Sequence, residues 1–332
     1  MKNILKFGIL GCGMIADIHA KAINSLENAE LIGVADNNIE SAKLLADKYG
    51  VKAFNDYNEM LNSAEIDAVC ICTPSGFHAD NAITALNAGK NVVLEKPMAI
   101  SIEDAERVIS ACNKTDKKLT VISQLRFSED VIKLKELIEQ NAFGTLVFCD
   151  LSMKYWRDPQ YYATSNWKGT FKFDGGGALM NQGIHGVDLL LYIAGNAKLL
   201  NAKVKTSFHK IEVEDTAVAT IQFENGALGT IKASTCTYPG FERKIEILGS
   251  NGCAVLRENK FEKLVVNGET VVNEINVTQH NTANDPAAVQ YEAHAKQINN
   301  FINAVLCNED LLIDEFEGQK AVKLIEEIYN FK

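Results

Sequence analysis

The stretch Phe7-Gly-Ile-Leu-Gly11-Cys-Gly13-Met-Ile-Ala16 decides the fold of the first part of the chain. Its apolar run, residues 7–10, predicts a buried strand, and the glycines that follow predict a tight turn into a helix. The spacing fits G-x-G-x-x-G/A, the turn that holds the pyrophosphate of a dinucleotide at a helix N-terminus. Gly11 permits the turn, Gly13 lets the backbone approach the phosphates, and Ala16 lets helix and strand pack closely.

A carboxylate follows at the position that selects the cofactor. Residues 30–35 predict the second strand, and Asp36 ends it, about 20 residues beyond Ala16. A carboxylate there accepts hydrogen bonds from the adenosine ribose hydroxyls and repels a 2′-phosphate. The two asparagines that follow supply no cation to offset this repulsion, so we expect NAD rather than NADP. The contacts expected in the turn itself are Gly11, Gly13, Met14 and Ile15.

Length, composition and charge limit the class of protein. The 332 residues suggest about two domains, and a hydrophobic content of 47% is ordinary for a globular chain. The acidic residues exceed the basic ones by 43 to 33, without a basic stripe, which argues against nucleic acid or an anionic membrane as a partner. No apolar run approaches the roughly 18 residues of a membrane span. The first apolar run is also too short for a signal peptide, so we expect a cytoplasmic protein.

Cysteines and histidines carry no metal or disulfide signature. The eight cysteines form no C-x-x-C pair, and the six histidines form no pair four residues apart. We therefore expect reduced, buried thiols and no metal site. His19 and His294 are expected to have structural or surface roles.

The strand-then-helix rhythm continues through the first 124 residues and then changes. Alternating apolar strands and helices predict a doubly wound parallel sheet covered on both faces, an α/β domain of residues 1–124. Beyond residue 124, strand-like runs dominate, separated by turns such as Glu224-Asn-Gly226 that suit antiparallel hairpins. Two helices, predicted at residues 287–306 and 315–329, close the chain. We expect residues 125–332 to form a second domain.

Three further motifs carry a family resemblance. Thr73-Pro-Ser-Gly-Phe-His78 follows the fourth predicted strand and Glu95-Lys96-Pro97 the fifth, at the strand ends where parallel sheets bind ligands. Asp174-Gly-Gly-Gly-Ala-Leu-Met-Asn181-Gln-Gly-Ile-His185-Gly-Val-Asp188 lies deeper in the chain. Together with the glycine turn, these motifs resemble the glucose–fructose oxidoreductase/inositol dehydrogenase (Gfo/Idh/MocA) family. The resemblance covers essentially the whole chain in order.

The resemblance implies a fold and an activity. It implies a Rossmann domain followed by an α+β domain with a large open, mostly antiparallel sheet that is often used for oligomer contacts, hence a homodimer or homotetramer. It implies hydride transfer between a nicotinamide and a sugar, cyclitol or related ring carbinol. Lys96 matches the family lysine that contacts substrate and nicotinamide, and His185 matches the catalytic histidine. The matches in the loops that line the cofactor are Thr73, Pro74, His78 and Glu95.

The side chains themselves suit carbinol chemistry. Oxidation needs a base for the hydroxyl proton, and the pKa of histidine lies near working pH. It also needs a cation beside the developing alkoxide, which the Lys96 ammonium supplies. Asn181, His185 and Asp188 are spaced to share one helical face. For Asp188, a structural hydrogen bond and a role near the site remain open.

The residue type at position 181 is informative about the substrate class. Inositol dehydrogenases of the family commonly carry Asp four residues before the histidine, whereas Asn181 can orient a hydroxyl or an amide but cannot relay a proton. Asparagine within A-L-M-N-Q-G-I-H is similar to the branch that contains UDP-N-acetylglucosaminuronate 3-dehydrogenases, which oxidise the C3 hydroxyl of a nucleotide-linked uronate. An inositol or simple-sugar dehydrogenase is the alternative. A non-catalytic dinucleotide-sensing regulator is the alternative of another class.

Other aromatic and cationic residues are candidate ligand contacts, with core or surface roles as the alternative. Arg157 and Lys168 have the charge to bind a carboxylate or phosphate, and Trp167 could wall the nicotinamide or a sugar ring. Gln124 and Arg126 follow the sixth strand and are expected at the nicotinamide ribose or the substrate. Tyr238 lies in a Pro-Gly turn and is a candidate for the substrate pocket.

Overall fold

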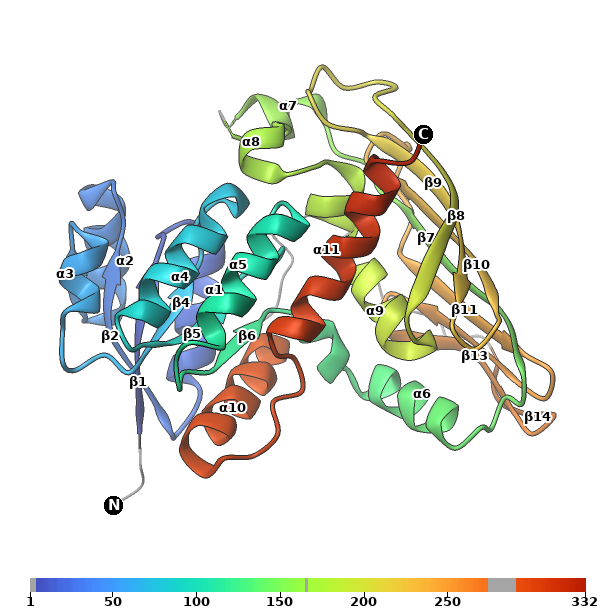
Figure 1. The fold of residues 1–332 in the computed structure, drawn as a ribbon, viewed down its shortest axis with the longest axis horizontal. Helices are drawn as coiled ribbons and strands as arrows, with labels where there is room; N and C mark the ends of the chain where they lie inside the picture. The colour runs from blue at the N-terminus through green and yellow to red at the C-terminus, as the bar shows by residue number, and fades with distance from the viewer. Residues whose placement is uncertain (1–3, 165–166, 274–290) are drawn as a thin grey trace. The chain divides into compact units, whose positions relative to one another are not determined.

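The chain folds into two compact units, shown as a ribbon in Figure 1. The computed structural model describes residues 4–164, 167–273 and 291–332. The first unit comprises residues 1–124 and 289–319, and the second comprises residues 125–288 and 320–332. Among the described helices, none combines the length and the apolar character that crossing a bilayer requires.

The first unit contains a parallel sheet of six strands in the order β3-β2-β1-β4-β5-β6. All of its pairings are parallel. The order reverses between β1 and β4, and this switch point is where open α/β sheets bind ligands. The predicted Rossmann architecture is confirmed. The strands are β1 (Leu5–Leu10), β2 (Ala29–Ala35), β3 (Lys52–Phe54), β4 (Ala68–Ile71), β5 (Asn91–Leu94) and β6 (Leu119–Val121).

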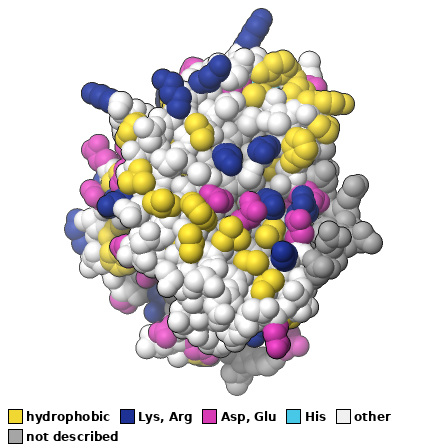
Figure 2. All heavy atoms as spheres, turned by 90° about the vertical axis from the view of Figure 1, so that its right-hand side faces the viewer, with side chains coloured by type: hydrophobic (Ala, Val, Ile, Leu, Met, Phe, Trp, Pro, Cys, Tyr) yellow, Lys and Arg dark blue, Asp and Glu magenta, His cyan; other side chains and the backbone are white. Residues whose placement is uncertain are grey.

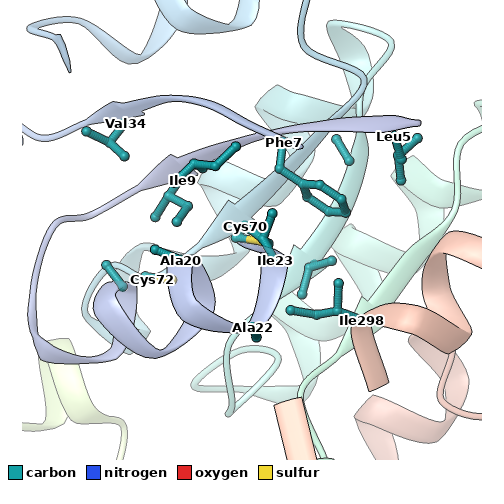
Figure 3. Close-up of a cluster of buried hydrophobic side chains, with 14 of the residues drawn as sticks. Leu5, Phe7, Ile9, Ala20, Ala22, Ile23, Val34, Cys70, Cys72 and Ile298 are labelled. Carbon is teal, nitrogen blue, oxygen red and sulfur yellow. The ribbon is translucent and has the colours of Figure 1, made fainter. Parts of the chain in front are cut away.

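Helices cover this sheet and bury its apolar side chains. Phe7, Ile9 and Cys70 of the central strands are fully buried, and Figure 3 shows them packed with Ile23 of the first helix and with Ile298. This core holds the strand ends that carry the motifs. The helices are α1 (Met14–Asn24), α2 (Ile39–Tyr49), α3 (Tyr57–Leu61), α4 (His78–Asn87), α5 (Ile102–Cys112) and α10 (Glu292–Cys307).

Helix α10 corrects the predicted domain division. The expected second domain included all of residues 125–332, but residues 289–319 belong to the first unit. The physical reason is the apolar face of α10, where Ile298, Phe301 and Ile302 are buried in the core of the Rossmann sheet. The Phe301 ring lies 6.4 Å from that of Phe7. The predicted start of this helix, at residues 287–290, lies outside the described residues.

The second unit contains a sheet of eight strands in the order β14-β13-β12-β11-β7-β10-β9-β8. Every pairing is antiparallel except the one between β10 and β7, which confirms the expected large, mostly antiparallel sheet. The strands are β7 (Leu146–Lys154), β8 (Ala197–Lys205), β9 (Thr216–Phe223), β10 (Leu228–Ser234), β11 (Lys244–Gly249), β12 (Cys253–Arg257), β13 (Lys260–Val266) and β14 (Glu269–Asn273).

Helix α9 (Ile184–Ala194) packs on one face of this sheet, against β7 and β11. The fit is close, because a side chain added at Gly186 would overlap the Met153 sulfur, 2.5 Å away. Of the predicted catalytic residues, His185 lies on α9 and Asn181 lies just before it, so the sheet supports both. The other helical elements outside the Rossmann sheet are the 3₁₀ turn η2 (Gln124–Phe127), α6 (Glu129–Glu139), α7 (Pro159–Ala163), α8 (Phe171–Asp174), the π-helical turn η3 (Ala178–Gly183) and α11 (Glu315–Tyr329). Residues 315–319 of α11 are counted with the first unit and the rest of the helix with the second.

Candidate functional site

The glycine turn has the geometry that a dinucleotide requires. Gly11 has a φ of +89°, and a Cβ there would lie 2.7 Å from the carbonyl oxygen of Cys72, so a larger residue does not fit. A Cβ on Gly13 would meet nothing within 4 Å. Gly13 caps α1 without any side-chain hydrogen bond to the first turn. The N–H groups that open α1 therefore remain available to an anion.

The Asp36 carboxylate is fixed beside this turn. One oxygen accepts the Cys12 N–H at 2.7 Å, and the other accepts the Asn38 N–H at 2.8 Å. Each carboxylate oxygen has a second lone pair, so both can also accept ribose hydroxyls. The turn and Asp36 together fit the adenosine half of NAD.

His78 joins the two loops that end β4 and β5. Its buried ring lies with Nδ1 2.7 Å from the Pro97 carbonyl oxygen and Nε2 2.8 Å from the Thr73 carbonyl oxygen. Burial lowers the pKa of His78. Pro74, in the loop that follows β4, precedes a short 3₁₀ turn. The ring therefore connects the two loops, and its predicted contact with the cofactor stays a prediction.

Glu95 is buried beside two histidines that the sequence did not connect with it. His19 Nε2 lies 2.7 Å from Glu95 Oε1, and His294 Nε2 lies 3.8 Å from the same oxygen. Burial would raise the pKa of Glu95, but hydrogen bonding and charge from both histidines outweigh burial and hold that pKa well below its usual value. Glu95 Oε2 accepts the N–H of Lys96 at 3.2 Å.

Gln124 offers a buried acceptor in the first unit. Its side-chain oxygen Oε1 is buried, and among the described residues it has no hydrogen-bond partner. A buried polar atom without a partner is unfavourable unless a ligand satisfies it. This supports the expectation that Gln124 contacts the cofactor.

In the second unit, Glu214 anchors the segment that carries Asn181. Its buried carboxylate accepts the N–H groups of Gly177 and Leu179, both at 2.8 Å, and the Tyr329 hydroxyl at 2.9 Å. Burial raises the pKa of Glu214. A Cβ on Gly177 would lie 1.9 Å from the Glu214 carbonyl oxygen, which explains the glycine. The sequence contained no signal for this anchor, because Glu214 lies far along the chain.

Asn181 lies at the centre of a polar network. Its amide nitrogen donates to Asp174 Oδ1 at 2.5 Å, and its amide oxygen accepts from Gln182 Nε2 at 2.9 Å. Gln182 Oε1 in turn accepts from two nitrogens of Arg157, at 2.8 and 3.1 Å. Asn181 lies in the π-helical turn η3, so the predicted single helix consists of two successive elements, and the shared face of Asn181 and His185 stays a prediction. Only His185 and Asp188 share α9.

The Arg126 guanidinium forms a buried ion pair with Asp188. The contacts are Nε to Oδ2 at 3.0 Å and Nη2 to Oδ1 at 2.6 Å. The guanidinium also lies 4.6 Å from the Tyr192 ring centroid. This gives Asp188 the structural partner that the sequence left open. The predicted contact of Arg126 with substrate is not supported, since the side chain is 1% exposed.

The remaining candidates differ in exposure. Arg157 is buried, and besides Gln182 it donates to the Trp156 carbonyl oxygen at 3.1 Å. Lys168 is partly exposed, and its ammonium lies 4.1 Å from the Tyr161 ring centroid and 5.8 Å from that of Trp167. Burial lowers the pKa of Lys168. Tyr238 is 76% exposed and meets the Trp156 ring edge-on, so its predicted place in a pocket stays a prediction.

Comparisons with known proteins cover both units. Residues 5–123 match the family model described as "Oxidoreductase family, NAD-binding Rossmann fold", and residues 131–255 match the "GFO/IDH/MocA C-terminal domain". The chain is 31% identical to the WlbA dehydrogenase from Bordetella pertussis, solved in complex with NADH and UDP-GlcNAcA. The alignment covers 98% of this chain and 95% of that one, with a TM-score of 0.87.

Two curated proteins show comparable similarity. The glucose-6-phosphate 3-dehydrogenase of Bacillus subtilis is 31% identical over 74% of this chain and 72% of its own length. The myo-inositol 2-dehydrogenase of Thermotoga maritima is 29% identical over 79% of this chain and 78% of its own length.

Proposed function

The chain belongs to the Gfo/Idh/MocA family of oxidoreductases, and on this basis we propose that it transfers hydride between NAD and a ring carbinol of a nucleotide-linked N-acetyl uronate. The broader activity, an NAD-dependent dehydrogenase acting on CH–OH groups, follows from the family and from the dehydrogenases among its relatives. The narrower substrate class is our inference.

One observation carries the substrate class: the similarity to a dehydrogenase solved with UDP-GlcNAcA extends over nearly the whole chain. The network around Asn181 supports it. Asp174 and Gln182 fix the orientation of the Asn181 amide. A neutral amide held in this way is suited to hydrogen bonding with an N-acetyl or hydroxyl group, and it cannot relay a proton.

The proposed catalytic roles divide between three residues. In the oxidation direction, His185 takes the proton of the substrate hydroxyl, and the Lys96 ammonium stabilises the oxygen as negative charge develops. Asn181 orients the substrate. NAD, when bound, would supply the hydride acceptor for the carbinol carbon. In reduction, His185 returns the proton to the oxygen.

The expected cofactor contacts fit NAD. Gly11 and Gly13 leave room for the pyrophosphate, and Asp36 retains acceptor capacity for the ribose. Gln124 offers an unpaired oxygen to a ligand donor. Met14, at the start of α1, is 67% exposed, in keeping with a place beside the cofactor.

An inositol or simple-sugar dehydrogenase is the second candidate. It is favoured by the names of curated relatives at 29–31% identity, which act on glucose 6-phosphate and myo-inositol. The two candidates differ in one chemical respect, since a nucleotide sugar carries a diphosphate and a uronate carboxylate. Lys168 is the partly exposed cation among the predicted substrate contacts of the second unit.

A single-turnover experiment tests the proposal. Stoichiometric protein and NAD are mixed with UDP-N-acetylglucosaminuronate, glucose 6-phosphate or myo-inositol in separate reactions, and NADH absorbance is followed. Reading the first turnover makes the result independent of cofactor release. We expect the nucleotide sugar to give the fastest burst. A burst with inositol or glucose 6-phosphate alone would favour the second candidate, and no burst with any sugar would favour a dinucleotide-sensing protein.

The same proposal includes a homo-oligomer that uses the large sheet, in a reducing, cytoplasmic location. Apolar side chains are exposed on the outer face of the sheet (Figure 2). Phe148 and Leu228 are register partners, and they are 46% and 44% exposed. Exposed apolar residues side by side are typical of interaction surfaces. The eight cysteines are free, which is consistent with a reducing compartment, but the expectation that all are buried is wrong, because Cys307 is exposed and only Cys70, Cys72, Cys112 and Cys149 are buried. Sedimentation analysis of the wild type and of Phe148→Glu tests the interface.

A further inference from the structure

A buried group of three side chains in the first unit has no part in the function proposed above. His19 on α1, Glu95 after β5 and His294 on α10 are 0%, 5% and 1% exposed. Their nitrogen and oxygen atoms lie within 4.8 Å of one another. Within residues 4–164, 167–273 and 291–332, this is the one group of three or more His, Cys, Asp or Glu side chains gathered in this way.

The distances favour a hydrogen-bonded group over a metal centre. His19 Nε2 and Glu95 Oε1 are 2.7 Å apart, a hydrogen-bond length, whereas two ligands of a tetrahedral zinc ion lie about 3.3 Å apart. The Nδ1 atoms of His19 and His294 are buried, and the part of the chain that the structure describes offers them no hydrogen-bond partner. A metal-bound histidine normally donates its second ring N–H to an acceptor. Protonation of His19 at Nε2, with donation to Glu95, leaves no proton on its unpartnered Nδ1.

We propose that His19, Glu95 and His294 form a positioning triad for Lys96, a role that rests on the function proposed above for that lysine. Glu95 Oε1 accepts from His19, and Oε2 accepts the Lys96 N–H at 3.2 Å. The His294 Nε2 atom, 3.8 Å from Oε1, directs its N–H dipole at the same charge. A carboxylate engaged through both oxygens cannot rotate freely, so it holds the backbone from which the Lys96 side chain extends.

Glu95 depends on both imidazoles for its charge. A carboxylate removed from water is unstable as an anion unless donors or cations surround it. Here the two rings meet edge to face, with centroids 5.5 Å apart, and both turn Nε2 towards the carboxylate. The nearby Cys70 thiol does not add charge, because burial raises its pKa. Loss of either ring therefore weakens the hold on Lys96.

Each member of the triad is fixed by a different element. His19 lies on α1, the helix that begins at the dinucleotide turn. His294 lies on α10, one turn before Ile298, which packs into the core shown in Figure 3. The triad therefore links the cofactor turn, the Lys96 loop and a helix from the far end of the sequence. This link gives α10 a role beyond core packing.

The test uses variants of the full-length protein with two readouts. His19→Leu and His294→Leu each remove one ring donor. His19→Gln keeps a donor, because its amide nitrogen can replace imidazole Nε2. Ile302→Val, on the same helix as His294, is the control that loosens the core without touching the triad. Hydrogen exchange of the Lys96 amide requires no substrate, and steady-state kinetics separate kcat from KM.

We expect exchange at the Lys96 amide to rise about tenfold or more in both leucine variants, with kcat lowered about tenfold to a hundredfold and KM nearly unchanged. His19→Gln should recover most of both values, and Ile302→Val should change neither. Unchanged exchange in folded leucine variants would overturn the proposal, as would an equal effect in Ile302→Val or one bound zinc ion per wild-type chain.

Two further cases are variants that do not fold and a wild-type protein without activity. If the leucine variants do not fold, Glu95→Gln replaces them, because it keeps the shape and removes the charge, and it must give the same rise in Lys96 exchange. If the wild-type protein turns over no sugar, the proposed function fails, while the exchange measurement still decides whether the triad holds the Lys96 backbone.

Discussion

Replacing Asp188 with asparagine tests whether this carboxylate supports α9 or takes part in the chemistry. It faces Arg126 through contacts of 2.6 and 3.0 Å, and the two side chains are 8% and 1% exposed. Asparagine keeps the shape but removes the negative charge that faces the buried guanidinium. Removing one partner of a buried pair costs about 3–5 kcal/mol. Because the Asn oxygen still accepts one hydrogen bond, we expect the lower end, about 3 kcal/mol.

Urea denaturation followed by tryptophan fluorescence measures this loss. Both tryptophans, Trp156 and Trp167, lie in the second unit with Arg126 and Asp188, so the signal reports unfolding of that unit. The double variant Arg126→Met/Asp188→Leu is the control, and it should lose less than the sum of the single changes. A loss below about 1 kcal/mol, the range of an exposed pair, would refute the structural role. Abolished turnover at unchanged stability would instead place Asp188 in the reaction.

Four further predictions concern single side chains. His185→Ala should lower the single-turnover rate about a hundredfold or more while the Kd for NADH, from fluorescence titration, stays nearly constant; a wild-type rate would exclude His185 as the base. Asp36→Asn should lower the ratio of the Kd for NADPH to the Kd for NADH about tenfold, because the charge that repels the 2′-phosphate is lost while the amide oxygen still accepts the Cys12 N–H. An unchanged ratio would contradict this prediction. Lys168→Gln should raise the KM for the nucleotide sugar about tenfold with kcat nearly unchanged. If the variant and the wild type have the same KM, Lys168 does not bind the substrate. Asp215 accepts three backbone N–H groups, which outweigh burial and lower the pKa of its carboxyl, so its contribution to stability is fully present above the ordinary pKa of 3.8 and is lost as the pH falls through the lower pKa of the folded state. In Asp215→Asn, the free energy of unfolding in urea should therefore fall less steeply at acid pH. An equally steep fall in the wild type and the variant would contradict this prediction.

The first unit was largely predictable because its rules are local. The apolar run at residues 7–10, the Gly11 turn and the carboxylate at Asp36 each act over a few neighbouring residues, and together they specify strand, turn and helix. The observed order of six parallel strands follows from repeating that unit. What local rules could not supply was the return of α10 to this sheet. An amphipathic helix at the end of a chain carries no indication of which core will bury it.

The same limit explains the missed triad. His19, Glu95 and His294 come from elements that meet only in the folded unit. No spacing rule connects His294 with a carboxylate so far away in sequence. Likewise, the motif A-L-M-N-Q-G-I-H predicted a helix around Asn181 and His185, but not the π-helical turn, which depends on Glu214 bonding the N–H groups of Gly177 and Leu179.

Burial changes how the predicted cations should be interpreted. Charge suggested that Arg157 and Lys168 could meet an anionic substrate, and its place after the sixth strand suggested Arg126 for the nicotinamide ribose or the substrate. Arg126 is committed to Asp188, and Arg157 holds Gln182, which in turn orients Asn181. Both arginines therefore act through neighbouring side chains, where a planar guanidinium with several donors is most effective. Lys168 instead meets aromatic faces and remains partly exposed, so of these three cations it is the one that we propose for contact with a phosphate or carboxylate.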